Sequence, residues 1–174
     1  PEADVAAEAA AFRPSFLHLA MLIQSPLANQ RDRFMAVLEA EKGGPLDERE
    51  QRLLDERVNA VGSWLAVYAP DRYRLEVHTD ALPDGAAALD ADQRRFLAEL
   101  AADLRGAWPT TGEAWQRAIF RVAALAGIEA RRAFLAIYLA FLGRENGPRA
   151  GWILAPYQPE FVLGRLEAAS GAVA

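Results

Sequence analysis

The chain has 174 residues, a formal net charge of −5 and no cysteine, and 52% of its residues are hydrophobic. This composition excludes disulfides, thiolate metal sites and cysteine nucleophiles, and it is typical of one globular domain or a close pair of helical subdomains. The longest uncharged apolar run, 133–142, is far shorter than the roughly 20 residues that a membrane-spanning helix needs, so it predicts a buried core helix.

The amino-terminal segment 1–12 is rich in alanine and acidic residues. Because the chain starts at Pro1 rather than at methionine, we interpret it as a piece of a longer protein, and 1–12 as a linker or a helix joined to a missing upstream domain. Helical periodicity then begins after Pro14. Capping-box patterns open three later helices, at Asp47 with Glu50, at Asp90 with Gln93 and at Thr110 with Glu113.

Periodicity and breaking residues predict helices over about 15–25, 31–41, 47–69, 90–104, 110–126, 129–142 and 159–169. The stretch 71–85 has no convincing period and is predicted as an ordered connector. In the helix that begins near Thr110, the residues expected to face the core are Trp115, Ile119, Val122, Leu125 and Ala126. Gly127 and Gly143 are placed to end two of the helices.

No segment alternates like a strand for long, so the predicted fold class is all-α, a bundle of six to eight helices. We divide it into an N-terminal helical subdomain, 13–105, and a C-terminal helical subdomain, 106–174. An excess of arginine distinguishes the C-terminal part of the chain. The window 105–165 holds eight arginines and four glutamates, a charge of +4, whereas the rest of the chain has 11 basic and 20 acidic residues, a charge of −9.

Catalytic and metal-binding patterns are missing from the sequence. His18 and His78 are the only histidines, and their neighbours do not supply the paired acids or ligands that catalysis or zinc binding needs. Glycine-rich nucleotide loops and nucleophile elbows do not occur either. We therefore assign no catalytic and no metal residue, and we expect the chain itself to be non-catalytic.

A glycine-rich loop follows the predicted core helix, with the sequence Gly143-Arg-Glu-Asn-Gly-Pro-Arg-Ala-Gly151. One interpretation is a helix-capping turn in which the arginines bond the last carbonyls of the helix. The other interpretation is a binding loop. The residues alone favour the capping turn.

The run from Phe134 to Arg149, FLAIYLAFLGRENGPR, resembles a signature near the carboxyl terminus of class I, or archaeal-type, lysyl-tRNA synthetases. Three upstream blocks match that family in the same order, and the resemblance covers 16–166. These blocks are Trp64-Leu-x-x-Tyr-Ala-Pro70, Leu89-x-x-Asp-Gln-Arg-Arg-Phe-Leu97 and Thr110-x-x-Glu113.

The resemblance implies a helical cage, similar to that of glutamyl-tRNA synthetases, which receives the anticodon stem-loop of a lysine tRNA during protein biosynthesis. It also implies a cytoplasmic ligase whose missing catalytic domain binds lysine and ATP with magnesium. The two nucleotide motifs of class I synthetases are absent here, so no cofactor is expected in this chain. We expect its partners to be the tRNA and its own catalytic domain, with homodimer contacts also open and no membrane.

Unpaired anticodon bases stack on aromatic rings or guanidinium planes, so arginine and aromatic residues are the candidates for anticodon binding. They are Arg72, Tyr73, Arg117, Arg121, Arg131, Arg132, Arg144, Arg149, Trp152 and Tyr157. For Trp152 and Tyr157, core packing is an equal alternative. For Trp64, Trp115 and Tyr138, core packing is favoured because they lie on apolar helix stripes.

Two other functions stay open. The acidic first half and the absence of a dense basic stripe also fit a free-standing helical module for protein interaction or regulation, derived from a synthetase. The cage of a glutamyl-type synthetase would change the tRNA but not the mode of binding.

Overall fold

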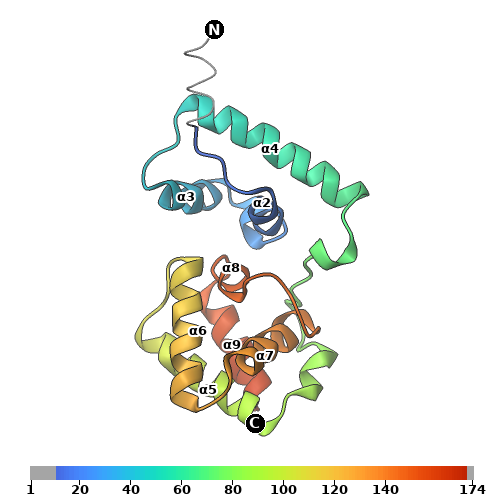
Figure 1. The fold of residues 1–174 in the computed structure, drawn as a ribbon, viewed down its shortest axis with the longest axis vertical. Helices are drawn as coiled ribbons and strands as arrows, with labels where there is room; N and C mark the ends of the chain where they lie inside the picture. The colour runs from blue at the N-terminus through green and yellow to red at the C-terminus, as the bar shows by residue number, and fades with distance from the viewer. Residues whose placement is uncertain (1–10, 172–174) are drawn as a thin grey trace. The chain divides into compact units, whose positions relative to one another are not determined.

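The computed structural model describes residues 11–171, in which eight α-helices and no strand occur (Figure 1). The predicted all-α class is confirmed. Most of the segment 1–12, which we predicted as a linker or helix, lies outside the described residues. The chain divides into two compact units, Pro1–Arg74 and Leu75–Ala174. The predicted boundary at 105/106 lies in the last turn of the helix Ala91–Gly106, within the second of these units.

The first unit is built around its longest helix, α4 (Glu48–Val67), against which α2 (Phe16–Leu22) packs. Between them lie a 3₁₀ turn, η1 (Pro26–Asn29), and α3 (Arg31–Lys42), and another 3₁₀ turn, η2 (Asp71–Tyr73), follows α4. The helix stripes of α2, α3 and α4 bury one apolar cluster. Its members include Leu19, Leu22, Leu27, Phe34, Leu38, Leu54 and Val61.

Glu50 joins three parts of the first unit. Its carboxylate accepts hydrogen bonds from Lys42 Nζ, from Phe12 N at 3.0 Å and from Asp47 N at 3.0 Å, the last completing the predicted capping box of α4. These donors, Lys42 first, lower the pKa of Glu50 from 4.5 to about 2. Glu50 is therefore ionised at neutral pH and ties the amino-terminal segment to α3 and α4.

Glu50→Gln is expected to remove an acid-sensitive part of the stability of the first unit. The folded-state pKa of Glu50 lies below its ordinary value, so the ionised carboxylate stabilises the fold above about pH 4.5, and this contribution is lost as the pH falls toward 2. In thermal unfolding, the Tm of the wild type should exceed that of Glu50→Gln by the largest amount at neutral pH and by the smallest amount near pH 2. Glu56→Gln, at an exposed position of the same helix, is the control. A difference that stays constant with pH would contradict the assignment.

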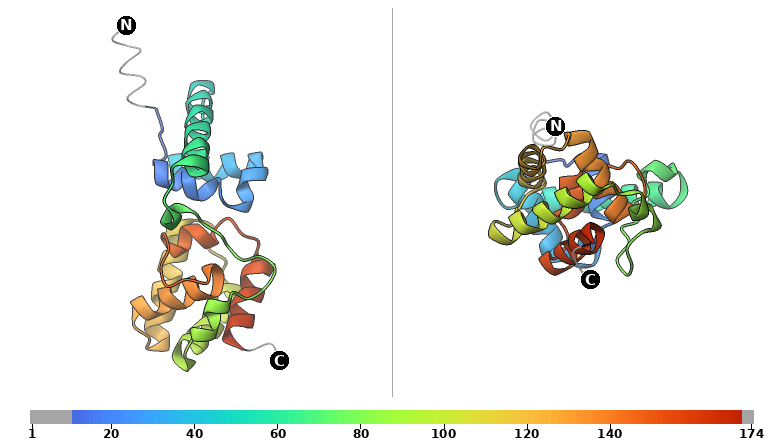
Figure 2. Two further views of the ribbon diagram at one scale, coloured as in Figure 1. Left: turned by 90° about the vertical axis from the view of Figure 1, so that its right-hand side faces the viewer. Right: turned by 90° about the horizontal axis from the view of Figure 1, so that it is seen from below.

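Within residues 75–171, the second unit contains a 3₁₀ turn and five α-helices. They are η3 (Asp84–Ala88), α5 (Ala91–Gly106), α6 (Gly112–Ala126), α7 (Ala130–Leu142), α8 (Ala150–Leu154) and α9 (Pro159–Ser170). In this unit, α5 packs against α9 and α6 packs against α8, and Figure 2 shows α9 in red beside the yellow-green α5. The largest fully buried side chains of this unit are Trp115, Phe96 and Phe141.

Local signals place most helix ends where the sequence predicts them. The Asp90–Gln93 capping box opens α5, and Gly127 and Gly143 end α6 and α7 with positive φ angles of 68° and 65°. The amino-terminal cap of α6 is Thr111, whose hydroxyl accepts from Ala114 N at 3.1 Å, so the predicted cap at Thr110 is wrong by one residue.

Two further expectations for the second unit need correction. Leu125 is 77% exposed rather than directed into the core, because α6 turns Val122 and Ala123 toward the core instead. The short helix α8 lies where no helix was predicted. None of the helices in residues 11–171 is long and apolar enough to cross a lipid bilayer.

Candidate nucleic-acid interface

The ten candidate residues divide between the two units. Arg72 and Tyr73 belong to the first, on η2 at its carboxyl end. The guanidinium carbon of Arg72 lies 4.8 Å from the centroid of the Tyr73 ring, which in turn lies 5.4 Å from the ring of Trp64. This stack holds Tyr73 against α4. The other eight candidates belong to the second unit.

Half of the eight arginines in the window 105–165 are neutralised or buried. Arg121 Nη1 and Nη2 donate to the two carboxylate oxygens of Asp103 at 2.6 and 2.8 Å, which raises the pKa of Arg121. Arg132 donates to Asp90 at 2.6 Å and lies 3.6 Å from Asp92. These bonds raise the pKa of Arg132, and those from Gln93 and Arg132 lower that of Asp90.

The other two of this half are Arg105 and Arg165. Arg105 forms an ion pair with Glu167 on α9. Arg165 is buried, where it donates to the carbonyl oxygens of His78 at 2.6 Å and Ala140 at 3.3 Å, and burial lowers its pKa. Four arginines of the window therefore serve the fold.

The other four have no such neutralisation. Within residues 11–171, no carboxylate lies within ion-pair distance of Arg117, Arg131, Arg144 or Arg149. Arg117 on α6, Arg131 on α7 and Arg149 before α8 are exposed, and Arg144 is partly buried. In a chain with net charge −5, these four are the cations of the second unit's window that remain available to an anion.

Close packing shapes the 143–149 loop. The hydroxyl of Tyr138 donates to the carbonyl oxygen of Pro148 at 2.8 Å, and a Cβ at position 147 would lie 2.8 Å from Leu142 and 3.1 Å from the ring of Tyr138. Gly147 thus lets the loop lie directly on α7. Tyr138 packs on the core as predicted and also anchors the loop.

Arg144 has an unusual environment in this loop. Its Nε and Nη2 atoms are buried and have no hydrogen-bond partner among the described residues. Such atoms are unfavourable without an acceptor, since they have lost hydration without compensation. An anion with several oxygen atoms would supply the acceptors that Arg144 lacks.

The predicted aromatic platforms have different positions. The guanidinium carbon of Arg149 lies 5.3 Å from the ring centroid of Trp152, and a Cβ at Gly112 would come within 2.5 Å of that indole. Trp152 is therefore held between Arg149 and the start of α6. Tyr157 is only 8% exposed, and burial raises its pKa to about 12. Its ring packs 5.0 Å from that of Phe161, so it offers no open face for stacking.

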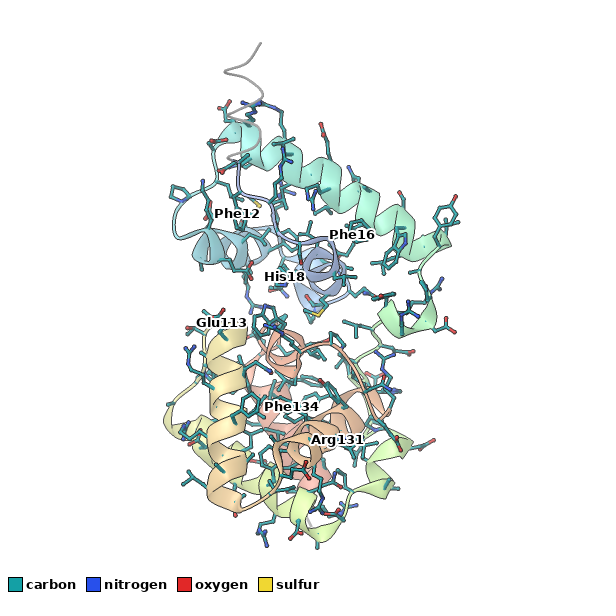
Figure 3. All side chains as sticks on the ribbon, in the orientation of Figure 1. Phe12, Phe16, His18, Glu113, Arg131 and Phe134 are labelled. Carbon is teal, nitrogen blue, oxygen red and sulfur yellow. The ribbon has the colours of Figure 1, made fainter. Side chains whose placement is uncertain are left out.

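Residues that were not among the candidates complete the exposed α6–α7 surface. Phe120 is 51% exposed, and its ring meets that of Phe134 edge to face at 5.1 Å. Figure 3 labels Phe134 and Arg131 on α7. Helical spacing could have found the two aromatics, because each follows one of the arginines, Arg117 or Arg131, by three residues.

The second unit is thus a small all-helical body with unneutralised arginines at the α6–α7 surface and in the adjoining loop. No family model matches the chain. It is 30% identical to a lysine-tRNA ligase of Methanosarcina barkeri, over 80% of this chain and 29% of the relative. It is 28% identical to one of Archaeoglobus fulgidus, over 88% of this chain and 30% of the relative.

A third lysine-tRNA ligase, from Methanopyrus kandleri, is 33% identical over 59% of this chain and 18% of its own length. These homologues are archaeal-type lysyl-tRNA synthetases, and they support a domain derived from a lysyl-tRNA synthetase. The chain spans about 30% of the length of the curated relatives that match most of it.

Proposed function

We propose that this chain is the anticodon-binding part of a lysine-tRNA ligase and that its ligand is the anticodon stem-loop of a lysine tRNA. One observation carries the proposal beyond the similarity to such ligases. Of the eight arginines between 105 and 165, four are neutralised or buried by the fold, and four, Arg117, Arg131, Arg144 and Arg149, have no carboxylate partner in the described structure.

The chemistry of these four side chains suits RNA. Planar guanidinium groups bond phosphate oxygens and the edges of unpaired bases, and they stack on bases. Arg144 adds to this support, because two of its nitrogen atoms lack an acceptor among the described residues. The Arg149 guanidinium over Trp152 is a second stacking surface in the same loop.

Catalysis would belong to another part of the longer protein. The resemblance to class I synthetases implies that ATP with magnesium, and lysine, bind a separate catalytic domain, so aminoacylation by the whole protein in the cytoplasm is part of this proposal. We assign no catalytic step to the residues of this chain.

The test is binding of the 174-residue chain to a lysine-anticodon stem-loop, compared with a stem-loop whose anticodon bases are changed, over a range of salt concentrations. We expect about tenfold weaker binding to the changed loop. If all four arginines contact phosphate, log K should fall with log salt with a slope near −2.8, about −0.7 for each contact. Equal binding to both loops, or none at low salt, would contradict the proposal.

Arg149→Ala is expected to weaken binding to both stem-loops and to reduce the salt slope by about 0.7, because it removes one phosphate contact. Arg121→Ala is the matched control, since Arg121 is paired with Asp103 through two hydrogen bonds and its charge is already neutralised. We expect the control to keep the wild-type salt slope. A larger effect of Arg121→Ala than of Arg149→Ala would mean that ion pairing does not decide which arginines bind.

A protein partner is the second candidate, and one observation favours it. At the end of α4 in the first unit, Val67 and Tyr68 are exposed, and an apolar patch of this kind is typical of a protein contact. The partner proposed for this patch is the catalytic domain of the same protein. Binding of a separately expressed catalytic domain, but not of RNA, would favour this interpretation.

A further inference from the structure

An aromatic pair lies at the surface of the second unit, where Phe134 is partly buried against the core and Phe120 is exposed. Phe120 on α6 is 51% exposed although it is among the largest apolar side chains of the unit. Its ring meets Phe134 of α7 edge to face, with centroids 5.1 Å apart and an interplanar angle of 71°. Such a pair covers at most one face of one ring, so aromatic surface remains for a third ring.

One arginine lies on each side of this pair. Arg117 precedes Phe120 by three residues on α6, and Arg131 precedes Phe134 by three residues on α7, so each lies about one helical turn from its aromatic neighbour. Because α6 runs toward the connecting turn and α7 runs away from it, Arg117 lies on the side far from the turn and Arg131 on the near side.

Neither arginine is occupied by the fold. In the described part of the chain, the side chains of Arg117 and Arg131 make no ion pair or hydrogen bond, in contrast to those of Arg121 and Arg132, which are paired with carboxylates. The nearest acidic position on the same face of α6 is Glu113, four residues before Arg117, and the two make no ion pair. Figure 3 labels Glu113 at the start of α6. The aromatic pair is thus flanked by two available positive charges.

We propose that Phe120 and Phe134 form a stacking platform for an unpaired RNA base, with Arg117 and Arg131 on the phosphates to either side of it. This inference rests on the proposed function and assigns it a surface. Single-stranded RNA fits because a base supplies a flat ring for Phe120 while its phosphates supply the negative charge that both arginines lack. An apolar protein surface would cover the aromatic pair but leave the two guanidinium groups without acceptors.

Phe120→Ala tests the platform, with binding of the 174-residue chain to the lysine-anticodon stem-loop as the measurement. Loss of one base stack should weaken binding about fivefold to a hundredfold, at every salt concentration. Phe120→Trp should bind within about threefold of the wild type or more tightly, because indole also stacks. Leu125→Ala is the matched control, since Leu125 is an exposed apolar residue of the same helix, 77% accessible.

The arginines are tested separately with Arg117→Ala combined with Arg131→Ala. This double variant should reduce the salt slope by about 1.4, twice the value for one phosphate contact to a single strand. If Phe120→Ala and the double variant both bind the stem-loop with the affinity of the wild type, the platform is overturned but the anticodon-binding function stays in place. Absence of any RNA binding by the wild type overturns both, and equal losses for Phe120→Ala and Leu125→Ala overturn the platform alone.

Discussion

Gly151→Ala is expected to destabilise the second unit by about 3 kcal/mol, at the upper end of the range for overpacked sites. A Cβ at position 151 would lie 2.2 Å from the carbonyl oxygen of Gly112 and 3.0 Å from the Cβ of Trp115. The backbone N–H of Gly151 also donates to Gln116 Oε1 at 2.9 Å. Since the obstructing atoms are mostly backbone and core, α8 would have to move away from α6.

Gly164→Ala is the matched control, and its change in the free energy of unfolding should have the opposite sign. Gly164 lies on the exposed face of α9, and a Cβ there would meet nothing within 4 Å. Alanine in an exposed helix interior is favoured over glycine by about 1 kcal/mol, so this variant should be more stable than the wild type. Chemical unfolding followed by tryptophan fluorescence reports the second unit well, because Trp108, Trp115 and Trp152 belong to it. If Gly151→Ala proved as stable as Gly164→Ala, the close contact of α8 with α6 described above would be contradicted.

Arg165→Met is expected to lower the free energy of unfolding by about 3 kcal/mol, the scale of hydrogen bonds made by a charged group. The Arg165 guanidinium donates to the carbonyl oxygens of His78 and Ala140 and lies 5.4 Å from the ring centroid of Phe161. Methionine keeps most of the apolar side chain but leaves both buried carbonyls without that donor. The segment before η3 would then lose its hydrogen bond to α9, while the backbone bond from His78 N to the Phe141 carbonyl oxygen of α7, at 3.1 Å, would remain.

Arg117→Met is the comparison for this prediction, because Arg117 is exposed and has no bonded partner among the described residues. Its effect on unfolding should stay within about 0.5 kcal/mol. In RNA binding the order should be reversed: Arg117→Met should weaken binding, and Arg165→Met should not. Equal stability of both variants would show that the buried hydrogen bonds of Arg165 contribute nothing to the fold.

Helix starts and ends could be predicted where the signal lies within one turn of the chain. The capping boxes of Asp47 with Glu50 and of Asp90 with Gln93 are confirmed, because each depends on two residues three apart. The same rule failed at Thr110, where the next residue is also threonine and serves as the cap. Helix α8 carried no such signal, since it has five residues and its glycine is explained only by contact with α6.

The sequence by itself determined the all-α class, the position of most helices and the excess of arginine between 105 and 165. Only the tertiary structure decided which of those arginines remain available. Arg121 and Asp103 are 18 residues apart and Arg132 and Asp90 are 42 apart, so counting charges within a window could not reveal these pairs. The reason is that electrostatic attraction depends on separation in space, and folding brings acids from outside the window onto three of its eight arginines, Arg105, Arg121 and Arg132.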